Sequence, residues 1–286
     1  MDYTPETGKI MLMNLDIQPA SDYPLPDLLH LLNLSFEDYL VAINFNLIQF
    51  LTMLRKDSID LFTSRVLLVE GEAAGIALIA RRGWTSRLAA MGIVKYMRGA
   101  GAGSWFMQKL IQEARDRKER EMVLEVIEQN HSAVKLYQKC GFSSVRRLVG
   151  LLRKQASENK DGALTEIDLR EAGKLISQFG ISDLPWQLSG ETIALLNPPA
   201  RAYRKNQAYV VISSPEAEHV VIWSLLVEPE ARGNDLGLGM LRSVIAQHAG
   251  KTWHVPAIFP EEFEKLFERA GFNREEISQW QMRLEL

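Results

Sequence analysis

Hydrophobic positions in the first half of the chain follow two periods, one typical of strands and one typical of helices. Helical spacing predicts helices near residues 25–34 and 43–55, and a longer helix opened by Gly103. The buried stripe of that longer helix is Phe106, Leu110 and Ala114. Short apolar or β-branched runs predict strands at residues 11–17, 65–70, 74–80, 89–95 and 122–128. Helices that alternate with strands indicate an α/β domain whose sheet is covered on both faces.

A further helix is predicted after residue 130. Asn130 is a good N-cap for it, and Gly141 suits the left-handed position that commonly comes after a helix. Its apolar face includes Tyr137 and Cys140. Cys140 is expected to be a small buried residue, because alanine stands in the matching place of a second copy of the pattern.

The sequence contains the same pattern twice. The segment Arg98-Gly99-Ala100-Gly101-Ala102-Gly103 returns 134 residues later as Arg232-Gly233-Asn234-Asp235-Leu236-Gly237. Leu136-Tyr137-Gln138-Lys139-Cys140-Gly141-Phe142 returns as Leu266-Phe267-Glu268-Arg269-Ala270-Gly271-Phe272 at an offset of 130, which a four-residue deletion explains. Upstream, Ile76-Ala77-Leu78 lies 134 residues before Val210-Val211-Ile212. Solenoid repeats have periods of only about 20–50 residues, so a whole domain is duplicated.

A polar stretch from Lys154 to Gly162 has no apolar periodicity and predicts a linker. We therefore expect two domains, residues 1–155 and residues 156–286. The length of 286 residues fits two domains of about 100–150 residues each. The first domain holds 20 basic against 17 acidic residues, and the second holds 13 against 19. Anion binding is accordingly expected in the first domain.

The composition is that of an ordinary globular protein. Hydrophobic residues make up 47% and charged residues 24%, which excludes disordered, collagen-like and coiled-coil classes. The net charge of −3 gives no general attraction to nucleic acid or to anionic membranes, so neither is expected as a partner. The longest uncharged run, residues 39–54, is shorter than the roughly 18–20 apolar residues of a spanning helix.

The cysteine and histidine content limits which disulfides and metal sites are expected. Cys140 is the only cysteine, which excludes an intramolecular disulfide and a cysteine-rich zinc site. The five histidines show no metal-ligand spacing, so no metal is expected. The first residues lack a basic segment followed by an apolar one, and we expect a cytoplasmic protein.

Three glycines at alternating positions, Gly99, Gly101 and Gly103, stand between a predicted strand and a predicted helix. Such a loop leaves backbone N–H groups accessible, the helix start adds about half a positive charge, and Arg98 adds a full one. The loop is a candidate pyrophosphate site, with a tight turn as the alternative. The dinucleotide fingerprint fails in both frames, which put Ser104 or Phe106 in its last small-residue position, and no P-loop motif is present.

The glycine loop and the two segments after it resemble one known family. Arg98-x-x-Gly101-x-Gly103, then Leu124-Glu125-Val126, then Asn130-x-x-Ala133-x-x-Leu136-Tyr137-x-x-x-Gly141-Phe142 is similar to the GCN5-related N-acetyltransferases (GNAT). In the first copy the resemblance runs from about residue 66 to residue 142. It implies an α/β fold of two tandem GNAT-like domains, each with a mixed, largely antiparallel central sheet flanked by helices and a splayed strand pair.

The resemblance also implies acetyl-CoA as the co-substrate. Its pyrophosphate would lie at the glycine loop, and its pantetheine arm would pair with residues 91–95. The cofactor-binding residues implied are Ile93, Val94, Lys95, Arg98, Gly99, Ala100, Gly101, Ala102, Gly103, Ser104, Asn130 and Tyr137. Lys95 stands where many members of the family have proline.

Acetyl transfer to an amine needs the neutral amine, and a lysine-like group of pKa about 10.4 is neutral only about once in 2,500 molecules at pH 7. Glu125 is the candidate base, directly or through water, because some members that acetylate protein N-termini use a glutamate there. An ordinary salt-bridged carboxylate is the alternative. The resemblance places Tyr137 near the sulfur as a candidate acid, with core packing as the alternative. Backbone N–H groups of Ile93 or Val94 would stabilise the oxyanion.

The second copy departs from the pattern where the chemistry would be. Asp235, Phe267 and Pro260 stand in the places of Gly101, Tyr137 and Asn130. We therefore expect residues 156–286 to form a degenerate GNAT-like domain in which acetyl-CoA binding is disfavoured.

The expected function is acetyl-CoA-dependent N-acetylation of a primary amine by direct attack in a ternary complex. The acceptor would be a small molecule or a peptide N-terminus, and an aromatic stripe is either core or a wall of its site: Phe36, Tyr39, Phe45 and Phe50. The alternative is a non-catalytic acyl-CoA-binding module that regulates or scaffolds a partner. A nicotinamide-dependent oxidoreductase is a third alternative.

Overall fold

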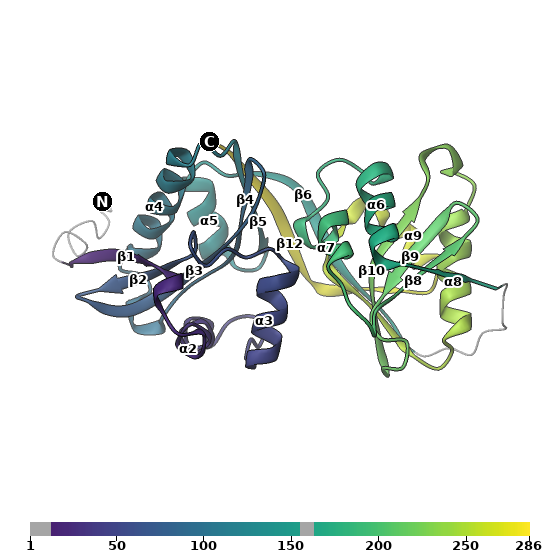
Figure 1. The fold of residues 1–286 in the computed structure, drawn as a ribbon, viewed down its shortest axis with the longest axis horizontal. Coiled ribbons are helices and arrows are strands. Elements are labelled where there is room, and N and C mark those ends of the chain that lie inside the picture. The colour runs from purple at the N-terminus through teal and green to yellow at the C-terminus, as the bar shows by residue number, and fades with distance from the viewer. Residues whose placement is uncertain (1–12, 155–162) are drawn as a thin grey trace, which may run out of the picture. The chain divides into compact units, whose positions relative to one another are not determined.

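The computed structural model describes residues 13–154 and 163–286, which fall into two compact units (Figure 1). The N-terminal unit holds the described residues up to Val145 together with Met282–Leu286, and the C-terminal unit holds Arg146–Gln281. The division lies before the expected cut at residue 155, and it returns a short C-terminal segment to the first unit. Most of the expected linker, residues 155–162, lies outside the described residues.

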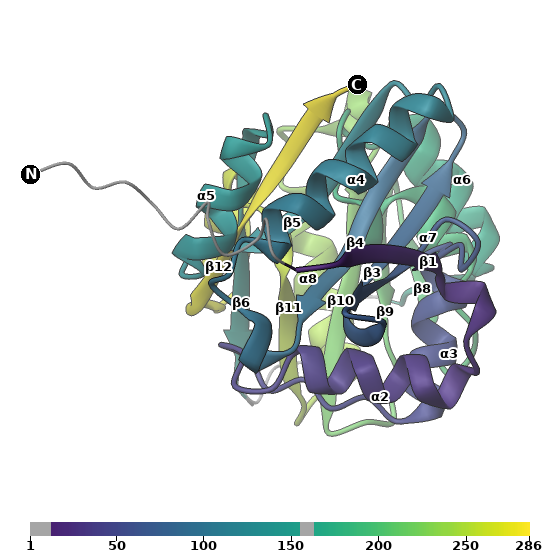
Figure 2. The ribbon, with the colours of Figure 1, turned by 90° about the vertical axis from the view of Figure 1, so that its left-hand side faces the viewer.

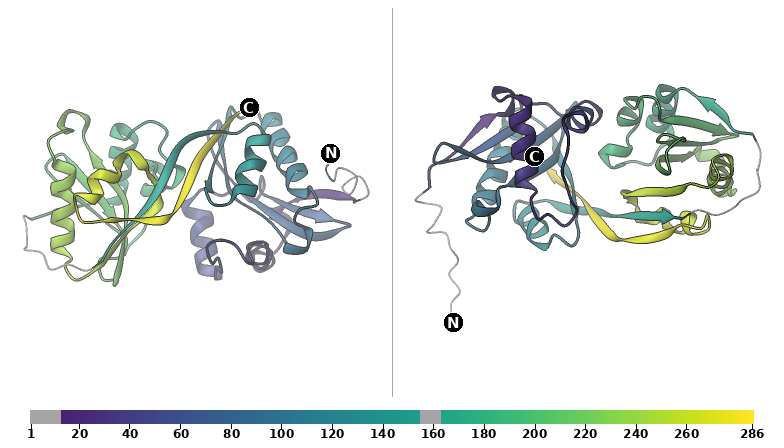
Figure 3. Two further views of the ribbon diagram at one scale, coloured as in Figure 1. Left: turned by 180° about the vertical axis from the view of Figure 1, so that it is seen from behind. Right: turned by 90° about the horizontal axis from the view of Figure 1, so that it is seen from below.

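The sheet of the N-terminal unit has the strand order β1-β2-β3-β4-β5-β12. Strands β1 to β4 pair antiparallel and β5 pairs parallel to β4, so the sheet is mixed and largely antiparallel, as expected. Seen from behind, the end of β12 runs beside β5 (Figure 3). The strands are β1 (Leu15–Pro19), β2 (Arg65–Val69), β3 (Glu72–Arg82), β4 (Thr85–Ile93), β5 (Glu121–Ile127) and the last part of β12 (Asn273–Glu285).

Helices cover both sides of this sheet, with α2 and α3 on one side and α4 and α5 on the other (Figure 2). The stripe predicted for α4 is confirmed, since Phe106, Leu110 and Ala114 are buried. Helix α3 starts later than predicted because Asn46 caps it: its side chain accepts from the Gln49 N–H, and the Gln49 side chain accepts from the Asn46 N–H. The helices are α2 (Leu25–Ser35), α3 (Leu47–Lys56), α4 (Ala102–Asp116) and α5 (His131–Lys139).

The C-terminal unit repeats this plan, with the strand order β12-β6-β11-β10-β9-β8-β7 and a parallel pair of β10 with β11. Buried side chains of β9 alternate between two clusters, Val210 in one and Val211 in the other, so both faces of its sheet are covered. Its other elements are β6 (Ser143–Arg153, shared with the first unit), β7 (Thr165–Ile167), α6 (Leu169–Phe179), α7 (Gly190–Ala194), β8 (Arg201–Lys205), β9 (Ala208–Ile212), β10 (His219–Val227), α8 (Leu236–Gln247), β11 (Thr252–Pro260) and α9 (Glu264–Glu268).

Strand pairing fixes how the two copies correspond. Strands β4 and β10 each carry one extra residue, Ala89 and Trp223, which are 134 apart. The strands paired with them, β3 and β9, have a different offset. Gly75 of β3 pairs with Ile93, whereas Ala208 of β9 pairs with Val227, which lies 134 residues after Ile93. The offset between β3 and β9 is therefore 133, and the expectation that 134 continues through residues 76–78 was wrong by one. A shift of one residue in a strand moves each side chain to the other face, so only the pairing could settle it.

Candidate active site

Strands β4 and β5 separate part-way along their length. They pair only at three rungs, from Thr85 with Glu121 to Arg87 with Val123, although β4 continues to Ile93 and β5 to Ile127. Beyond Arg87 the two strands diverge, and the side of β4 that faced β5 is left without a paired strand among the described residues. The splayed strand pair expected from the sequence is confirmed.

The alternation of antiparallel hydrogen bonds shows which backbone groups face this divergence. The Val94 N–H donates to the Ala74 carbonyl at 2.9 Å, so Val94 is bonded towards β3. Because bonded and non-bonded pairs alternate, Gly92 also faces β3, whereas Met91 and Ile93 face the divergence. Of the two oxyanion donors considered from the sequence, Val94 is already engaged and Ile93 faces the right side.

The glycine loop leads from β4 into the start of α4. Gly99 and Gly101 have φ of +80° and +88°, and Gly101 is the N-cap of α4, with Ala100 between them. A Cβ on Gly99 would meet no atom within 4 Å, so this part of the loop borders open space. The first intrahelical bond in α4 runs from the Ser104 N–H to the Gly101 carbonyl at 3.0 Å.

The start of α4 is held between β4 and α5. A Cβ on Gly103 would lie 3.5 Å from Cδ1 of Ile93, at the end of β4, and 3.7 Å from Cδ2 of Leu136, on α5. Leu136 directly precedes Tyr137 in the sequence. The N–H groups of the first helical turn, which include Ala102 and Gly103, have no acceptor within the helix. They form the kind of N-terminus that binds anions.

Arg98 has a role that the sequence did not indicate. Its guanidinium donates to three backbone carbonyls, through Nε to Ile93 at 2.9 Å and through Nη2 to Ser35 at 3.0 Å and Glu37 at 3.1 Å. Arg98 therefore ties the end of β4 to the end of α2 and positions the loop. Lys95 is exposed and pairs with Asp38 at 2.6 Å, which raises the pKa of Lys95 and links it to the segment after α2.

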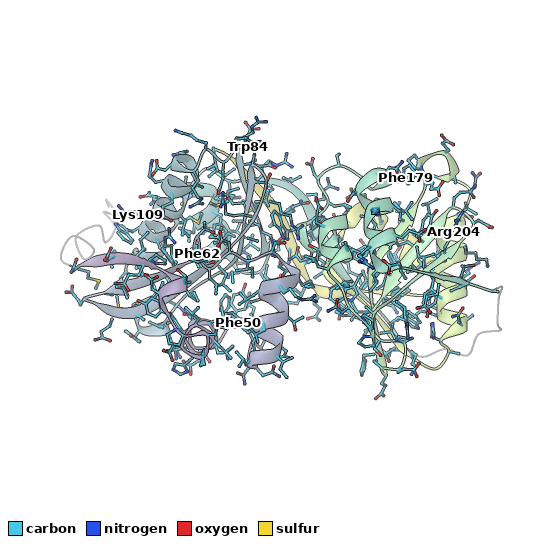
Figure 4. All side chains as sticks on the ribbon, viewed as in Figure 1. Phe50, Phe62, Trp84, Lys109, Phe179 and Arg204 are labelled. Carbon is cyan, nitrogen blue, oxygen red and sulfur yellow. The ribbon has the colours of Figure 1, made fainter. Side chains whose placement is uncertain are left out.

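The connection between α2 and α3 comes close to β4. A Cβ on Gly92 would lie 2.7 Å from Ser35 Cβ and 3.0 Å from the Phe36 ring, so only glycine permits this approach. Phe36 in turn meets Tyr39 edge to face, at 5.1 Å between ring centroids. Phe50 on α3, labelled in Figure 4, is fully buried and belongs to the core. Phe36, Tyr39 and Phe45 are half-buried.

Tyr137, Asn130 and Tyr39 come together at the start of α5. Tyr137 is 7% exposed and packs on Phe142, and burial raises its pKa, so its hydroxyl stays protonated across the working range of pH. Asn130 caps α5 by accepting from the Ala133 N–H at 3.2 Å, as predicted. Its side chain also hydrogen-bonds Tyr39, whose pKa is raised by burial. The sequence had indicated Tyr39 only as one member of an aromatic stripe.

Glu125 lies two residues beyond the last β4–β5 rung. Its Oε2 accepts from Arg87 Nε at 2.7 Å, and the side chains of Glu125 and Arg87 are only 3% and 6% exposed. Asp57, the C-cap of α3, lies 3.9 Å from Arg87. The structure thus puts the candidate base where the strands begin to diverge, inside a buried cluster of three charges. The ion pair with Arg87 also agrees with the alternative interpretation of Glu125 as an ordinary salt-bridged carboxylate.

The C-terminal unit has the same divergence without the same groups. Strands β10 and β11 pair only from His219 with Thr252 to Val221 with His254. Asp235, the N-cap of α8, is left-handed like Gly101, with φ of +55°. Its carboxylate accepts two hydrogen bonds from Arg269, at 2.9 Å each. Arg232 repeats the role of Arg98, donating to Val227 at 3.0 Å and also to Phe179.

The described residues show neither a metal-binding cluster nor a membrane-spanning helix. In the two described stretches, no group of three or more His, Cys, Asp and Glu side chains is arranged to hold a metal ion. No helix among the same residues is long and apolar enough to cross a membrane. Cys140 is half-buried at the end of α5, and burial raises the pKa of its thiol.

Likeness to known proteins agrees with this geometry. Residues 25–142 match the model of the acetyltransferase (GNAT) family, and the match lies within the N-terminal unit. These residues form a GNAT acetyltransferase domain. The comparison with curated proteins finds no match.

Solved structures extend the likeness to the whole chain. A putative acetyltransferase from Pyrococcus horikoshii is 13% identical with a TM-score of 0.66, over 96% of this chain and 89% of the other. A GCN5-related N-acetyltransferase from Sphaerobacter thermophilus is 16% identical with a TM-score of 0.66, over 96% and 95%. A tandem GNAT protein from the clavulanic acid biosynthesis pathway is 14% identical with a TM-score of 0.64, over 96% and 98%. At such identities the likeness is one of fold, and the chain has the tandem GNAT fold.

Proposed function

We propose that the GNAT domain transfers an acetyl group from acetyl-CoA to a primary amine, by direct attack of the amine in a ternary complex. One observation carries the proposal: β4 and β5 diverge beyond Arg87, with the Ile93 backbone facing the divergence and the start of α4 beside Ile93. A thioester extended along β4 would reach both groups at once.

The glycine loop fits a diphosphate. Gly99 borders open space, Gly101 holds the left-handed conformation that starts α4, and the first turn of α4 supplies N–H donors. No acidic residue lies between Arg98 and Gln112 to oppose an anion. Bound acetyl-CoA supplies the acetyl group as a thioester, and residues Gly99 to Ser104 with Asn130 are proposed to hold it.

Three groups of the chain are proposed to act at the thioester. The Ile93 N–H donates to the oxygen on which charge develops. Glu125 takes the proton from the amine, through a water. Tyr137, kept protonated by its burial, gives a proton to the departing sulfur. Cys140 takes no covalent part, since burial raises the pKa of its thiol and keeps the weakly nucleophilic protonated form.

The acceptor is proposed to enter from the side of α2 and α3. Glu125 lies on that side, because its partner Arg87 reaches the C-cap of α3. The half-buried rings of Phe36, Tyr39 and Phe45 would form the wall against which a small amine or a peptide N-terminus lies. A cytoplasmic location remains part of the proposal.

The test is the pH dependence of kcat/KM for Glu125→Gln. Without a base the reaction depends on amine already neutral in solution, so the variant should lose about 10²–10⁴-fold at pH 7. The deficit should shrink towards pH 10, where solution itself supplies neutral amine. A purely structural role would lower activity equally at every pH.

Two further variants separate charge pairing from catalysis. Glu125→Gln leaves the buried Arg87 without its partner, so the double variant Glu125→Gln/Arg87→Gln is the matched control. Recovery of activity in the double variant would remove Glu125 from the mechanism. Tyr137→Phe should lower kcat and leave the KM for acetyl-CoA unchanged, with the equivalent Phe267→Tyr as a silent control. Binding of acetyl-CoA with no thiol release across a library of amines would instead indicate a binding module.

A further inference from the structure

The C-terminal unit contains a cavity of about 330 Å³ where β10 and β11 diverge. Its wall is formed by these strands, the end of α6, where Figure 4 labels Phe179, the start of α8, and α9. Apolar side chains dominate this wall, among them Ile176, Leu184, Leu225, Phe259, Phe263 and Phe267. The volume is in the range of small-molecule sites, which are about 300–1,000 Å³.

Ser224 stands among apolar side chains in this wall, which also includes the charged residues Arg232 and Asp235 just before α8. Ser224 is 8% exposed and lines the cavity. The matching residue of the N-terminal unit is Ala90, so the hydroxyl belongs to this copy alone. A hydroxyl in a mainly apolar pocket can form a hydrogen bond that orients a ligand.

The neighbouring backbone adds a second polar feature. The Glu228 N–H donates to the Gln207 carbonyl at 3.0 Å, which sets the alternation of bonds between β10 and β9. By that alternation the N–H and carbonyl of Leu225 face the side from which β11 has departed. Leu225 and Ser224 therefore offer polar groups side by side in a mainly apolar cavity.

The carboxylate of Asp235, at the start of α8, disfavours a phosphate in this cavity. Asp235 belongs to the cavity wall and occupies the N-cap of α8, where the N-terminal unit has Gly101. Arg269 holds the Asp235 carboxylate with two hydrogen bonds and lowers its pKa, so this position carries the chain's own anion. A diphosphate at this helix start would have to displace that pair.

We propose that this cavity binds an uncharged, mainly apolar small molecule that presents a carbonyl or hydroxyl group to Ser224 and Leu225 and carries no phosphate. The site acts by binding alone, since Phe267 replaces the tyrosine that would donate a proton. It is separate from the proposed acetyl-transfer site, which lies in the other unit.

The first experiment titrates the full chain with N-phenyl-1-naphthylamine, an uncharged apolar fluorescent probe. We expect one site with a micromolar Kd, as suits a ligand of this size. Leu225→Trp fills the cavity and should weaken binding at least tenfold. Met91→Trp, the matched change in the N-terminal unit, should leave the probe's Kd unchanged and weaken acetyl-CoA instead. Unchanged binding in Leu225→Trp, or lost binding in Met91→Trp, would overturn the proposal.

The second experiment tests the exclusion of phosphate. Saturating acetyl-CoA should leave the probe titration of the wild-type chain unchanged, whereas in Asp235→Gly it should compete with the probe. Competition in the wild-type chain would show a second acetyl-CoA site and refute the proposed ligand class. Ser224→Leu fills the cavity from another wall and replaces Leu225→Trp if that variant fails to fold. Acetyl transfer is measured on every variant, so loss of the proposed function is seen separately from loss of this site.

Discussion

The two units share a scaffold and differ at three side chains where chemistry would occur. Gly101, Tyr137 and Asn130 of the N-terminal unit are replaced by Asp235, Phe267 and Pro260 in the C-terminal unit. Around these positions the strand divergence, the one-residue bulge and the arginine that ties strand to helix are the same. The divergence therefore does not require these three side chains, whereas the proposed acetyl transfer does.

The replacement of Asn130 by Pro260 also changes the local structure. Asn130 caps a nine-residue helix through its side chain. Pro260 has no capping side chain, and it is followed by a short 3₁₀ turn (Glu261–Phe263) and only five residues of α9. In the C-terminal unit this one replacement removes both a helix cap and a residue proposed to contact acetyl-CoA.

The largest expected effect comes from copying the C-terminal loop into the N-terminal one. Gly101→Asp should raise the Kd for acetyl-CoA by about ten- to hundredfold, because a carboxylate then lies beside the diphosphate. The left-handed conformation itself tolerates aspartate, as Asp235 demonstrates. Gly101→Asn is the matched control, equally tolerant of that conformation but uncharged. Equal Kd values for the two variants, measured by calorimetric titration, would mean that charge does not distinguish the two loops.

A smaller effect is expected where α2 approaches β4. Gly92→Ala puts a methyl group 2.7 Å from Ser35 Cβ and should lower the free energy of unfolding by about 1–3 kcal/mol, measured by urea denaturation. The matching position of the C-terminal unit is Leu226, so the close approach is not a requirement of the fold. Gly103→Ala, which meets only ordinary contacts, is the control. A Gly92→Ala protein as stable as wild type would show that α2 can move away from β4 without cost.

The smallest effect is expected at Cys140, whose counterpart is Ala270. Cys140→Ala should leave acetyl transfer within about twofold of wild type, because burial raises the thiol pKa and disfavours the nucleophilic thiolate. Alkylation of Cys140 by iodoacetamide, followed by mass spectrometry, should stay slow at pH 8 and accelerate only above the ordinary thiol pKa of about 8.5. Rapid alkylation at pH 7 or an inactive alanine variant would reopen a covalent route.

Local signals in the sequence were sufficient to predict the structural features that depend on residues close together in the chain. The α4 stripe, the Asn130 cap and the left-handed Gly141 are predictable from spacing and residue type, and the structure has all three. The later start of α3 was also readable, since Asn46 followed three residues later by Gln49 is a capping box.

Parts that depend on distant residues could not be predicted. Arg98 meets carbonyls of Ser35 and Glu37, more than sixty positions away, and nothing in its own surroundings signals them. Glu125 pairs with Arg87 across two strands whose partnership is itself a result of folding. Likewise, the single-residue difference between β3 and β9 appears only when the ladders are paired.

The last strand has a consequence for how the protein is made. The Leu286 N–H donates to the Arg120 carbonyl at 3.0 Å, and Arg283 pairs with Glu121 at 3.1 Å, so residues 282–286 belong beside β5. During translation β5 stays an open edge until these residues leave the ribosome, and open edges invite wrong pairing. A nascent chain thus completes its first unit only after the second has been synthesised, and a fragment cut at residue 155 would carry that unprotected edge permanently.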